Sequence, residues 1–340
     1  MSGPASTPPL LLVEDLRVEY ATDHGDAVTI DGLSLEIRDG ETLGIVGESG
    51  SGKSMTSLAI LGLLPRSARV SGSIRFRGRE LVGLSEDELR ELRGKEIAMV
   101  SQDALTALNP VMTVGDQLAE AVRVHRAGAS RSELRARAVE LLQTVGIPSA
   151  EERVDQYPHQ FSGGMRQRVV IAMAIANDPA LLIADEPTTA LDVTVQAQVL
   201  EVLREVQDRT GTTVVMITHD LGVVAGTADR VLVMYAGNRV EEAPVDAIFH
   251  EPRHPYTRGL LAALPRMDKR TRGQRLYQIV GQPPAATALP DGCRFAPRCP
   301  SYLADPCSLS VPVARTLAPD HAVACHRAEQ LADELREVTA

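Results

Sequence analysis

The most constraining feature of the sequence is a glycine-rich octet at residues 47–54, GESGSGKS, which lies between two apolar segments. The preceding segment, Thr42–Val46, suits a buried strand, and the following one, Met55–Leu64, suits a helix. A strand, a glycine-rich turn and a helix in this order aim backbone N–H groups and a helix N-terminus at one point, where a phosphate chain binds. The octet also fits the spacing G-x-x-x-x-G-K-[ST], so the sequence predicts a nucleotide phosphate site.

Each type of residue in the octet has a task in such a site. The glycines let the backbone wrap around the phosphates, the Lys53 ammonium reaches the terminal phosphates, and the Ser54 hydroxyl holds Mg²⁺. The alternative is a glycine-rich turn that matches the motif by chance, and the strand before it and the helix after it argue against this. The predicted nucleotide-binding residues of the octet are Gly47, Glu48, Ser49, Gly50, Ser51, Gly52, Lys53 and Ser54.

Two acidic residues end another apolar segment. Leu181–Ala184 suits a buried strand and is followed directly by Asp185 and Glu186. Two acids at a strand end are more often the start of a solvated loop, but beside a phosphate site they indicate metal-dependent phosphoryl transfer. Asp185 would then hold Mg²⁺ through water, and Glu186 would orient and polarise the attacking water. The sequence therefore predicts a nucleoside triphosphatase.

The first 250 residues have the pattern of an α/β fold. Helical spacing of apolar residues covers Ser132–Val145 and Gln196–Arg209, and residues 103–161 have helical periodicity without a convincing strand, which indicates a helical insertion. Short apolar runs predict buried parallel strands at Thr42–Val46, Ile97–Val100, Leu181–Ala184, Thr213–Ile217 and Val231–Met234.

Composition excludes several classes of protein. The 340 residues carry a net charge of −10 and only ten aromatic side chains, whereas nucleic-acid binding needs a basic surface and stacking platforms. No run approaches the 18 or so apolar residues of a membrane-spanning helix. The N-terminus lacks the basic-then-apolar order of a signal peptide, so we expect a cytoplasmic chain that reaches a membrane only through a partner.

The last 90 residues differ from the rest, and we place a boundary near residue 250. They hold 11 of the 21 prolines and all four cysteines, which indicates a loop-rich tail with little apolar core. Clustered cysteines in a cytosolic chain favour a structural metal site over disulfides. Four thiolates suit either zinc or an iron–sulfur cluster, with unligated thiols as a third possibility. The cysteines are Cys293, Cys299, Cys307 and Cys325.

Four further segments stand in a fixed order along the chain. Gln102 follows one predicted strand, Ser162-Gly163-Gly164 opens an apolar helix, Asp192 comes soon after the paired acids, and His219 follows the strand Thr213–Ile217. Together with the octet and the acids, this set resembles the ATP-binding subunits of ABC transporters, and the resemblance covers essentially the whole chain. It implies an α/β P-loop NTPase fold, RecA-like, with a helical subdomain and a small Cys/Pro-rich C-terminal region.

The resemblance gives the signature Ser162-Gly163-Gly164 a role in a second subunit's site. It would close on the γ-phosphate held by the partner's octet, so that two subunits enclose two nucleotides. A hydroxyl and unhindered amides at a helix N-terminus suit an anion, although the same three residues also make an ordinary N-cap. Met165 stands where the family most often has glutamine, and its side chain is not a direct phosphate donor.

Four more roles follow from the resemblance alone. His219 would contact the γ-phosphate and help to position water, and Gln102 would sense Mg²⁺ and couple the site to the helical insertion. Asp192 would cross the dimer interface. Tyr20 stands where the family has an aromatic that stacks on adenine, and an ordinary strand aromatic is a serious competing interpretation.

Three segments resemble one branch of the family. Residues 253–258 (RHPYTR), 101–110 and 160–168 resemble the oligopeptide/dipeptide importers, a branch that also includes nickel and some glycoside importers. Peptide is the favoured solute. The cysteine spacing resembles a tail that binds a [4Fe-4S] cluster in some peptide-importer ATPases, which we favour over Zn²⁺. Arg294 and Arg298, between the ligands, would offset the charge of the cluster.

These observations combine into one hypothesis: an ATPase subunit of an ABC importer, peripheral at the cytoplasmic face of the membrane. Its partners would be permease subunits, a second ATPase subunit and an extracytoplasmic solute-binding protein, with no nucleic acid. Two rivals are a soluble ABC-type regulator and an ATP-sensing module. The single cassette and acidic charge argue against the first, and the intact Glu186 and His219 against the second. The predicted division is 1–102 with 162–250 as the RecA-like core, 103–161 as the helical subdomain and 251–340 as the tail.

Overall fold

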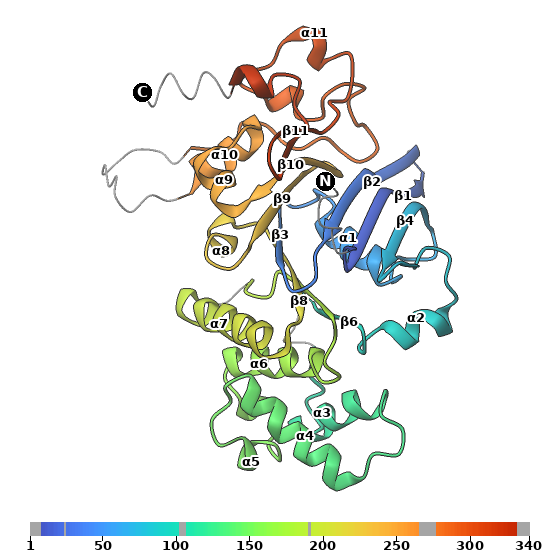
Figure 1. Cartoon of the computed structure of the whole chain (residues 1–340), viewed down its shortest axis with the longest axis vertical. Coiled ribbons are helices and arrows are strands. Elements are labelled where there is room, and N and C mark those ends of the chain that lie inside the picture. Colours follow the sequence, from blue (N-terminus) through green and yellow to red (C-terminus); the bar gives the residue numbers. More distant parts are fainter. Residues whose placement is uncertain (1–7, 24, 102–106, 190–191, 265–276, 332–340) are drawn as a thin grey trace, which may run out of the picture. The chain divides into compact units, whose positions relative to one another are not determined.

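The chain forms two compact units, each assembled from separate stretches of sequence. The structure is a computed structural model (Figure 1) that describes residues 8–23, 25–101, 107–189, 192–264 and 277–331. The first unit comprises Met1–Ile37, Leu43–Val82 and Thr218–Ala340. The second comprises Arg38–Thr42 and Gly83–Ile217. No helix within the described residues is both long enough and apolar enough to cross a membrane.

An antiparallel sheet makes up one part of the first unit. Its strand order is β2-β1-β4-β5. Leu11 on the central strand β1 pairs with Ile37 on one side and Phe76 on the other, and all three side chains are buried. Buried apolar side chains such as these stabilise the sheet. Register shifts occur in the pairing of β1 with both of its neighbouring strands. The strands are β1 (Leu11–Thr22), β2 (Gly25–Ile37), β4 (Ala68–Phe76) and β5 (Arg79–Glu80).

The other strands of the first unit run in the order β11-β12-β10-β9-β3. Parallel pairing joins β3 to β9, and antiparallel pairing joins β10 to β9 and to β12. Because Glu241 on β10 pairs with Val323 on β12, the last part of the chain shares a sheet with the strands that precede residue 250. The strands are β3 (Thr42–Val46), β9 (Arg230–Tyr235), β10 (Asn238–Pro244), β11 (Arg315–Ala318) and β12 (His321–Val323).

Short helices complete the first unit. They are α1 (Lys53–Ile60), α8 (Leu221–Val224), α9 (Val245–His250), α10 (Pro255–Ala263), the 3₁₀ helix η2 (Ala296–Arg298) and α11 (Ala304–Cys307). Three rings pack in one core: Tyr235 from β9, Tyr256 from α10 and Phe295 beside η2, each at most 2% exposed. Apolar packing thus connects the C-terminal region to the strands. The proline and cysteine content of this region did not predict such packing.

The second unit contains three parallel strands in the order β8-β7-β6. Leu181 on β7 pairs with Thr213 on β8 and with Ile97 on β6. All residues of β7 and β8 are buried, as expected of parallel strands covered on both faces. The strands are β6 (Ile97–Val100), β7 (Leu181–Asp185) and β8 (Thr213–Thr218).

The helices of the second unit include the group drawn in green in Figure 1, α3 to α5, with α4 packed against both α3 and α6. They are α2 (Glu86–Leu92), α3 (Val114–Arg123), α4 (Arg131–Thr144), α5 (Ala150–Arg153), η1 (Pro158–Gln160), α6 (Gly163–Ala174) and α7 (Val193–Thr210).

The five predicted strands are confirmed as β3, β6, β7, β8 and β9, with ends that differ by at most one residue. The helices predicted at Ser132–Val145 and Gln196–Arg209 are confirmed as α4 and α7, and the one predicted at Met55–Leu64 is confirmed as α1, which ends four residues earlier, at Ile60. Ser130 begins α4 with a capping box to Glu133, and Gly211 ends α7 in the left-handed conformation that favours glycine. Within the described residues 107–161 there are helices and no strand.

Candidate nucleotide site

The octet lies between β3 and α1, and its glycines are required by the surrounding space. A Cβ atom on Gly47 would lie 2.2 Å from the Met234 carbonyl oxygen, which leaves no room for any other residue. Gly52 has φ +102°, and a Cβ there would lie 2.9 Å from the Thr29 carbonyl oxygen. The loop can therefore take this tight path only with glycine at both positions.

Lys53 begins α1, and its ammonium points back into the loop. The side chain is buried, and Nζ donates hydrogen bonds to the carbonyl oxygens of Gly47 at 2.7 Å and Glu48 at 3.0 Å, with the Ser51 Oγ at 3.4 Å. The positive charge is thus held inside the curve of the loop, where phosphate oxygens would compete with these acceptors for it.

The outer side of the loop is fixed by residues far along the chain. The Glu48 N–H donates to the Tyr256 hydroxyl at 2.9 Å, and the Gly237 N–H donates to the Ser51 carbonyl at 2.9 Å. Because these groups approach from outside, they restrain the backbone of the loop while its inner side remains lined by the Lys53 ammonium.

The two acids occupy the end of β7 in the second unit. Asp185 is the last residue of the strand and is buried. Glu186 has φ +48°, an uncommon conformation for a residue with a side chain. Its N–H donates to the Ile217 carbonyl at 2.9 Å, and its carboxylate accepts from the Thr189 hydroxyl at 2.7 Å. The backbone of Glu186 is thereby anchored to β8, and its side chain is oriented by Thr189.

The signature residues lie at the start of α6. The Ser162 side chain is the N-cap and accepts from the Met165 N–H at 3.3 Å. A Cβ on Gly163 would meet no atom within 4 Å, so the space beside its Cα atom is open. A Cβ on Gly164 would lie 2.7 Å from Val195 Cγ1 of α7, so this glycine is needed for the packing of the two helices.

The other predicted site residues are distributed between the two units. In the second unit Asp192 is the N-cap of α7, where it accepts from the N–H groups of Thr194 and Val195. In the first unit His219 is exposed, directly after β8. Gln102 lies outside the described residues.

Tyr20 lies on β1, a position compatible with both interpretations of this residue. Its hydroxyl oxygen is buried, and it is one of the buried polar atoms of the described residues that make no hydrogen bond. Burial raises the pKa of this phenol. The hydroxyl therefore stays protonated at neutral pH.

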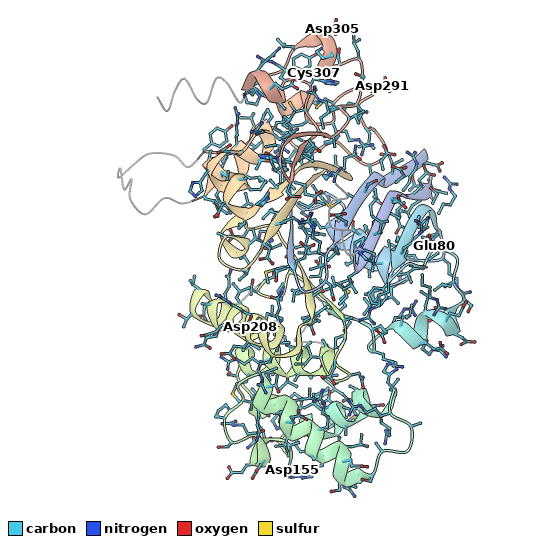
Figure 2. All side chains as sticks on the ribbon, in the orientation of Figure 1. Glu80, Asp155, Asp208, Asp291, Asp305 and Cys307 are labelled. Atoms are coloured by element: carbon cyan, nitrogen blue, oxygen red, sulfur yellow. The ribbon has the colours of Figure 1, made fainter. Side chains whose placement is uncertain are left out.

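The four cysteines line a common small cavity, together with Phe295 and Leu331. All four are free thiols. Figure 2 shows Cys307 in the C-terminal region at the end of α11, where it is buried, while Asp305 on the same short helix is exposed. Within the described residues no group of three or more His, Cys, Asp or Glu side chains is arranged to hold a metal ion.

Burial raises the pKa of three of these thiols, that of Cys325 to about 11. Backbone N–H groups act in the opposite direction at each of the three sulfur atoms: those of Phe295 and Ala296 at Cys293, of Ser301 at Cys299 and of Arg327 at Cys325. The site therefore offers thiols that are protonated when free and hydrogen-bond donors that favour thiolate.

Arg294 and Arg298 each have a carboxylate partner. Arg294 forms an ion pair with Asp31, and Arg298 forms one with Glu48 at 2.7 Å. Both arginines therefore connect the C-terminal region to other parts of the first unit, and their expected effect on charge at the cysteines stays a prediction.

Comparison with known proteins gives the family. The ABC transporter family model matches residues 30–189, and the model of the oligopeptide/dipeptide transporter C-terminal region matches residues 240–307. The oligopeptide transport ATP-binding protein OppD of Salmonella typhimurium is 53% identical over 86% of this chain and 86% of its own length. The chain belongs to the ABC transporter family.

Further relatives and structures agree with this assignment. The OppD of Escherichia coli is 50% identical over 94% of this ABC chain and 93% of its own length. The OppD of Mycobacterium tuberculosis is 54% identical over 94% of the chain, but the chain spans only about half (52%) of that relative.

Solved ABC cassettes share the fold. The ATP-binding cassette MJ0796, a dimer in a post-hydrolysis state with ADP and phosphate, matches with a TM-score of 0.61 and 29% identity, over 69% of this chain and 98% of its own. The structure of cbiO1 from Clostridium perfringens, part of the transporter complex cbiONQ, matches with a TM-score of 0.62 and 29% identity. The match covers 72% of this chain and 92% of the cbiO1 chain. The predicted P-loop NTPase fold is confirmed.

Sequence reasoning missed the residues that hold the octet from outside in this ABC cassette. In the sequence Tyr256 belongs only to a branch-specific segment, and Arg298 stands out only as a neighbour of cysteines. Gly237 had no signal at all. The arginine sits in a loop-rich segment 250 residues from its partner, so no local pattern could have indicated the contact.

Proposed function

We propose that the chain is the ATP-hydrolysing subunit of an ABC importer for oligopeptides. The observation that carries the proposal is the match of both family models, cassette and peptide-branch C-terminal region, within one chain that is 53% identical to an OppD over 86% of both lengths. The peptide-branch region distinguishes it from cassettes in general. Importers of nickel or other solutes of the same branch remain the alternative that a transport assay decides.

In this function the octet binds ATP. Backbone N–H groups of the loop and the Lys53 ammonium bind the phosphates, and Tyr20 stacks on the adenine. Ser54, Gln102 and, through water, Asp185 are the residues that would hold Mg²⁺, which would neutralise charge on the terminal phosphates.

Glu186 polarises the attacking water, and His219 steadies the γ-phosphate. The hydrogen bond from Thr189 orients the Glu186 carboxylate for this task. Ser162, Gly163 and Gly164 serve the nucleotide of a second ATPase subunit, with Asp192 at the interface between the two. The open space beside the Cα atom of Gly163 supports this role, because phosphate needs unhindered approach.

Partners and location follow from the same proposal. Reopening of the ATPase dimer after hydrolysis would drive permease subunits, through the helical subdomain at 103–161, at the cytoplasmic face of the membrane. A solute-binding protein would deliver the peptide. Co-purification of the full chain with permease subunits from membranes tests this, and the absence of any such partner would contradict it.

The decisive experiment replaces Glu186 by glutamine in the assembled complex. We expect ATP binding to be kept and hydrolysis to fall by a factor of about 10³ or more, because the water loses its base. Lys53→Ala should instead weaken ATP binding itself. Full turnover by Glu186→Gln would refute the assigned role. Uptake of labelled peptide, compared with uptake of nickel, identifies the solute class.

We also propose that the four cysteines hold a [4Fe-4S] cluster of structural role. The residues present fit such a group: four free thiols line one cavity, and backbone N–H groups point at three of the sulfur atoms. The preference for the cluster over Zn²⁺ comes from the cysteine spacing and its resemblance to other peptide-importer ATPases, because no group of three or more His, Cys, Asp or Glu side chains in the described residues is arranged to hold a metal ion. When bound, the cluster would supply covalent cross-links between the loops of the C-terminal region.

Metal analysis of the complex purified without oxygen tests the cluster. We expect about four iron and four sulfide per chain and a loss of both when Cys307 is replaced by serine. Zinc at about one per chain, without sulfide, would establish the alternative.

A further inference from the structure

The P-loop, the octet at residues 47–54, makes a second kind of contact with the C-terminal region that the proposed function does not use. Glu48 lies inside the octet but directs its carboxylate outward. Arg298 donates to both of its oxygens, from Nη1 to Oε2 at 2.7 Å and from Nη2 to Oε1 at 3.1 Å. This is the two-pronged geometry in which guanidinium and carboxylate bind most strongly.

Arg298 is held in place from several sides. Its side chain is only 5% exposed, its Nε donates to the Val280 carbonyl at 3.2 Å, and its guanidinium lies 5.7 Å from the centre of the Tyr235 ring. The ion pair is therefore preorganised on the side of the C-terminal region.

Tyr256 supplies a second, independent restraint. It is fully buried at the start of α10, and its hydroxyl accepts the hydrogen bond of the Glu48 N–H. The ring packs against Tyr235 with centroids 4.7 Å apart and against Phe295 at 5.4 Å. Because this amide is satisfied from outside the loop, it is not a phosphate donor, and its orientation is set before a nucleotide arrives.

We propose that Arg298 and Tyr256 are positioning residues for ATP, which hold the P-loop in its binding conformation by restraining Glu48. The P-loop of this chain is thus completed by side chains 208 and 250 residues further along the chain. The inference rests on the proposed ATP site and adds to it the residues that preorganise the loop. Neither side chain is placed to touch the nucleotide.

A positioning role has a specific kinetic signature. If the loop becomes ordered only when ATP binds, the cost of ordering weakens ATP binding equally in the ground state and in the transition state. KM therefore rises and kcat changes little. A purely structural role would instead lower the melting temperature and leave the ATP affinity of the folded molecules unchanged.

The test uses the full chain with Mg²⁺ and ATP. We expect Arg298→Ala to raise the Kd for ATP about tenfold. Arg298→Lys should recover part of that loss, because lysine keeps the positive charge but cannot make the two-pronged contact with the carboxylate. Tyr256→Phe should raise the Kd about threefold. Glu48→Gln should raise Kd about as much as Arg298→Ala, and the double variant should be no worse than either alone.

A matched control is available in the second unit. Arg135 makes a similar two-pronged pair with Asp155, which Figure 2 labels in the helical part of the chain, but both side chains are exposed. Arg135→Ala should leave the Kd for ATP unchanged. The ATP-induced rise in melting temperature should shrink for Arg298→Ala and stay at the wild-type value for Arg135→Ala.

Each outcome has a clear meaning. If wild-type chain binds no ATP, the proposed function fails. If the wild type binds ATP and both Arg298→Ala and Glu48→Gln match it, only the positioning role is refuted. Should Arg298→Ala fail to fold, Glu48→Gln decides, because the Glu48 side chain is 28% exposed and this substitution removes the same ion pair from an intact C-terminal region. Independent, additive effects of the two substitutions would also overturn the proposal.

Discussion

At the scale of single residues, the space around the P-loop decides which side chains it tolerates. The atom nearest to a Cβ on Gly47 would be the carbonyl oxygen of Met234 on β9, and Ser51 Oγ would lie at 2.8 Å. A backbone carbonyl in a strand cannot rotate away as a flexible side chain can. The motif spacing identified this glycine by its role toward phosphate, but its contact with β9 depends on tertiary structure.

Gly47→Ala should therefore damage both stability and function. We expect it to lower the free energy of unfolding by about 1–3 kcal/mol and to weaken ATP binding at least tenfold, because the loop must shift to admit the methyl group. Urea unfolding and calorimetric ATP binding measure the two effects. Gly226→Ala is the control, since a Cβ there meets no atom within 4 Å. Unchanged ATP affinity in Gly47→Ala would contradict this account.

His254 gives the chain a predictable response to acid. Its ring is fully buried and accepts the Tyr256 N–H at Nδ1, and burial lowers its pKa to about 4 from 6.5. In the unfolded chain the His254 ring is protonated below pH 6.5, whereas in the folded chain it is protonated only below about pH 4. Stability is therefore lost as the pH falls from 6.5 to 4, by about 3 kcal/mol for this group.

His254→Asn keeps a side-chain acceptor and removes the titration. We expect the free energy of unfolding of the wild type to fall more steeply between pH 6.5 and 4 than that of the variant, measured by urea unfolding at each pH. Parallel pH profiles for the two proteins would show that His254 is protonated in the folded state.

At the scale of elements, buried strands were predictable and half-buried ones were not. The parallel strands β3, β7 and β8 are covered on both faces, so each is a continuous apolar run in the sequence. In contrast, β1 alternates buried and exposed positions irregularly, because its pairings with β2 and β4 contain register shifts. The sequence of such a strand shows neither a strict alternation of apolar and polar residues nor a continuous apolar run.

The packing of α6 on α7 gives a prediction at this scale. Gly164→Ala should lower the free energy of unfolding by about 1–3 kcal/mol, because its methyl group would meet Val195 Cγ1. The double variant with Val195→Ala removes the obstructing methyl groups, so its loss should be smaller than the sum of the single losses. Urea unfolding of the three variants gives the coupling energy. Additive losses would show that the two helices adjust without this contact.

At the scale of the whole molecule, the C-terminal region is the part that sequence reasoning described least well. Its cysteines and prolines indicated a tail outside the cassette. Yet β12 pairs with β10, and the rings of Tyr256 and Phe295 fill the same core as Tyr235. These are contacts between residues about 20 to 80 positions apart, which composition cannot reveal. The predicted domain limits at 102, 162 and 250 stay a prediction.

Truncation at residue 250 tests whether the C-terminal region is a separable domain. The shortened chain would lose Tyr256 and Phe295 from the core, and each removal of a buried aromatic costs about 3–5 kcal/mol, so the total approaches the whole stability of a typical domain. We expect chain 1–250 to lack a cooperative thermal transition. A cooperative transition of 1–250 near that of the full chain would show that the cassette folds without this region, and the contacts to Glu48 would then serve ATP binding alone.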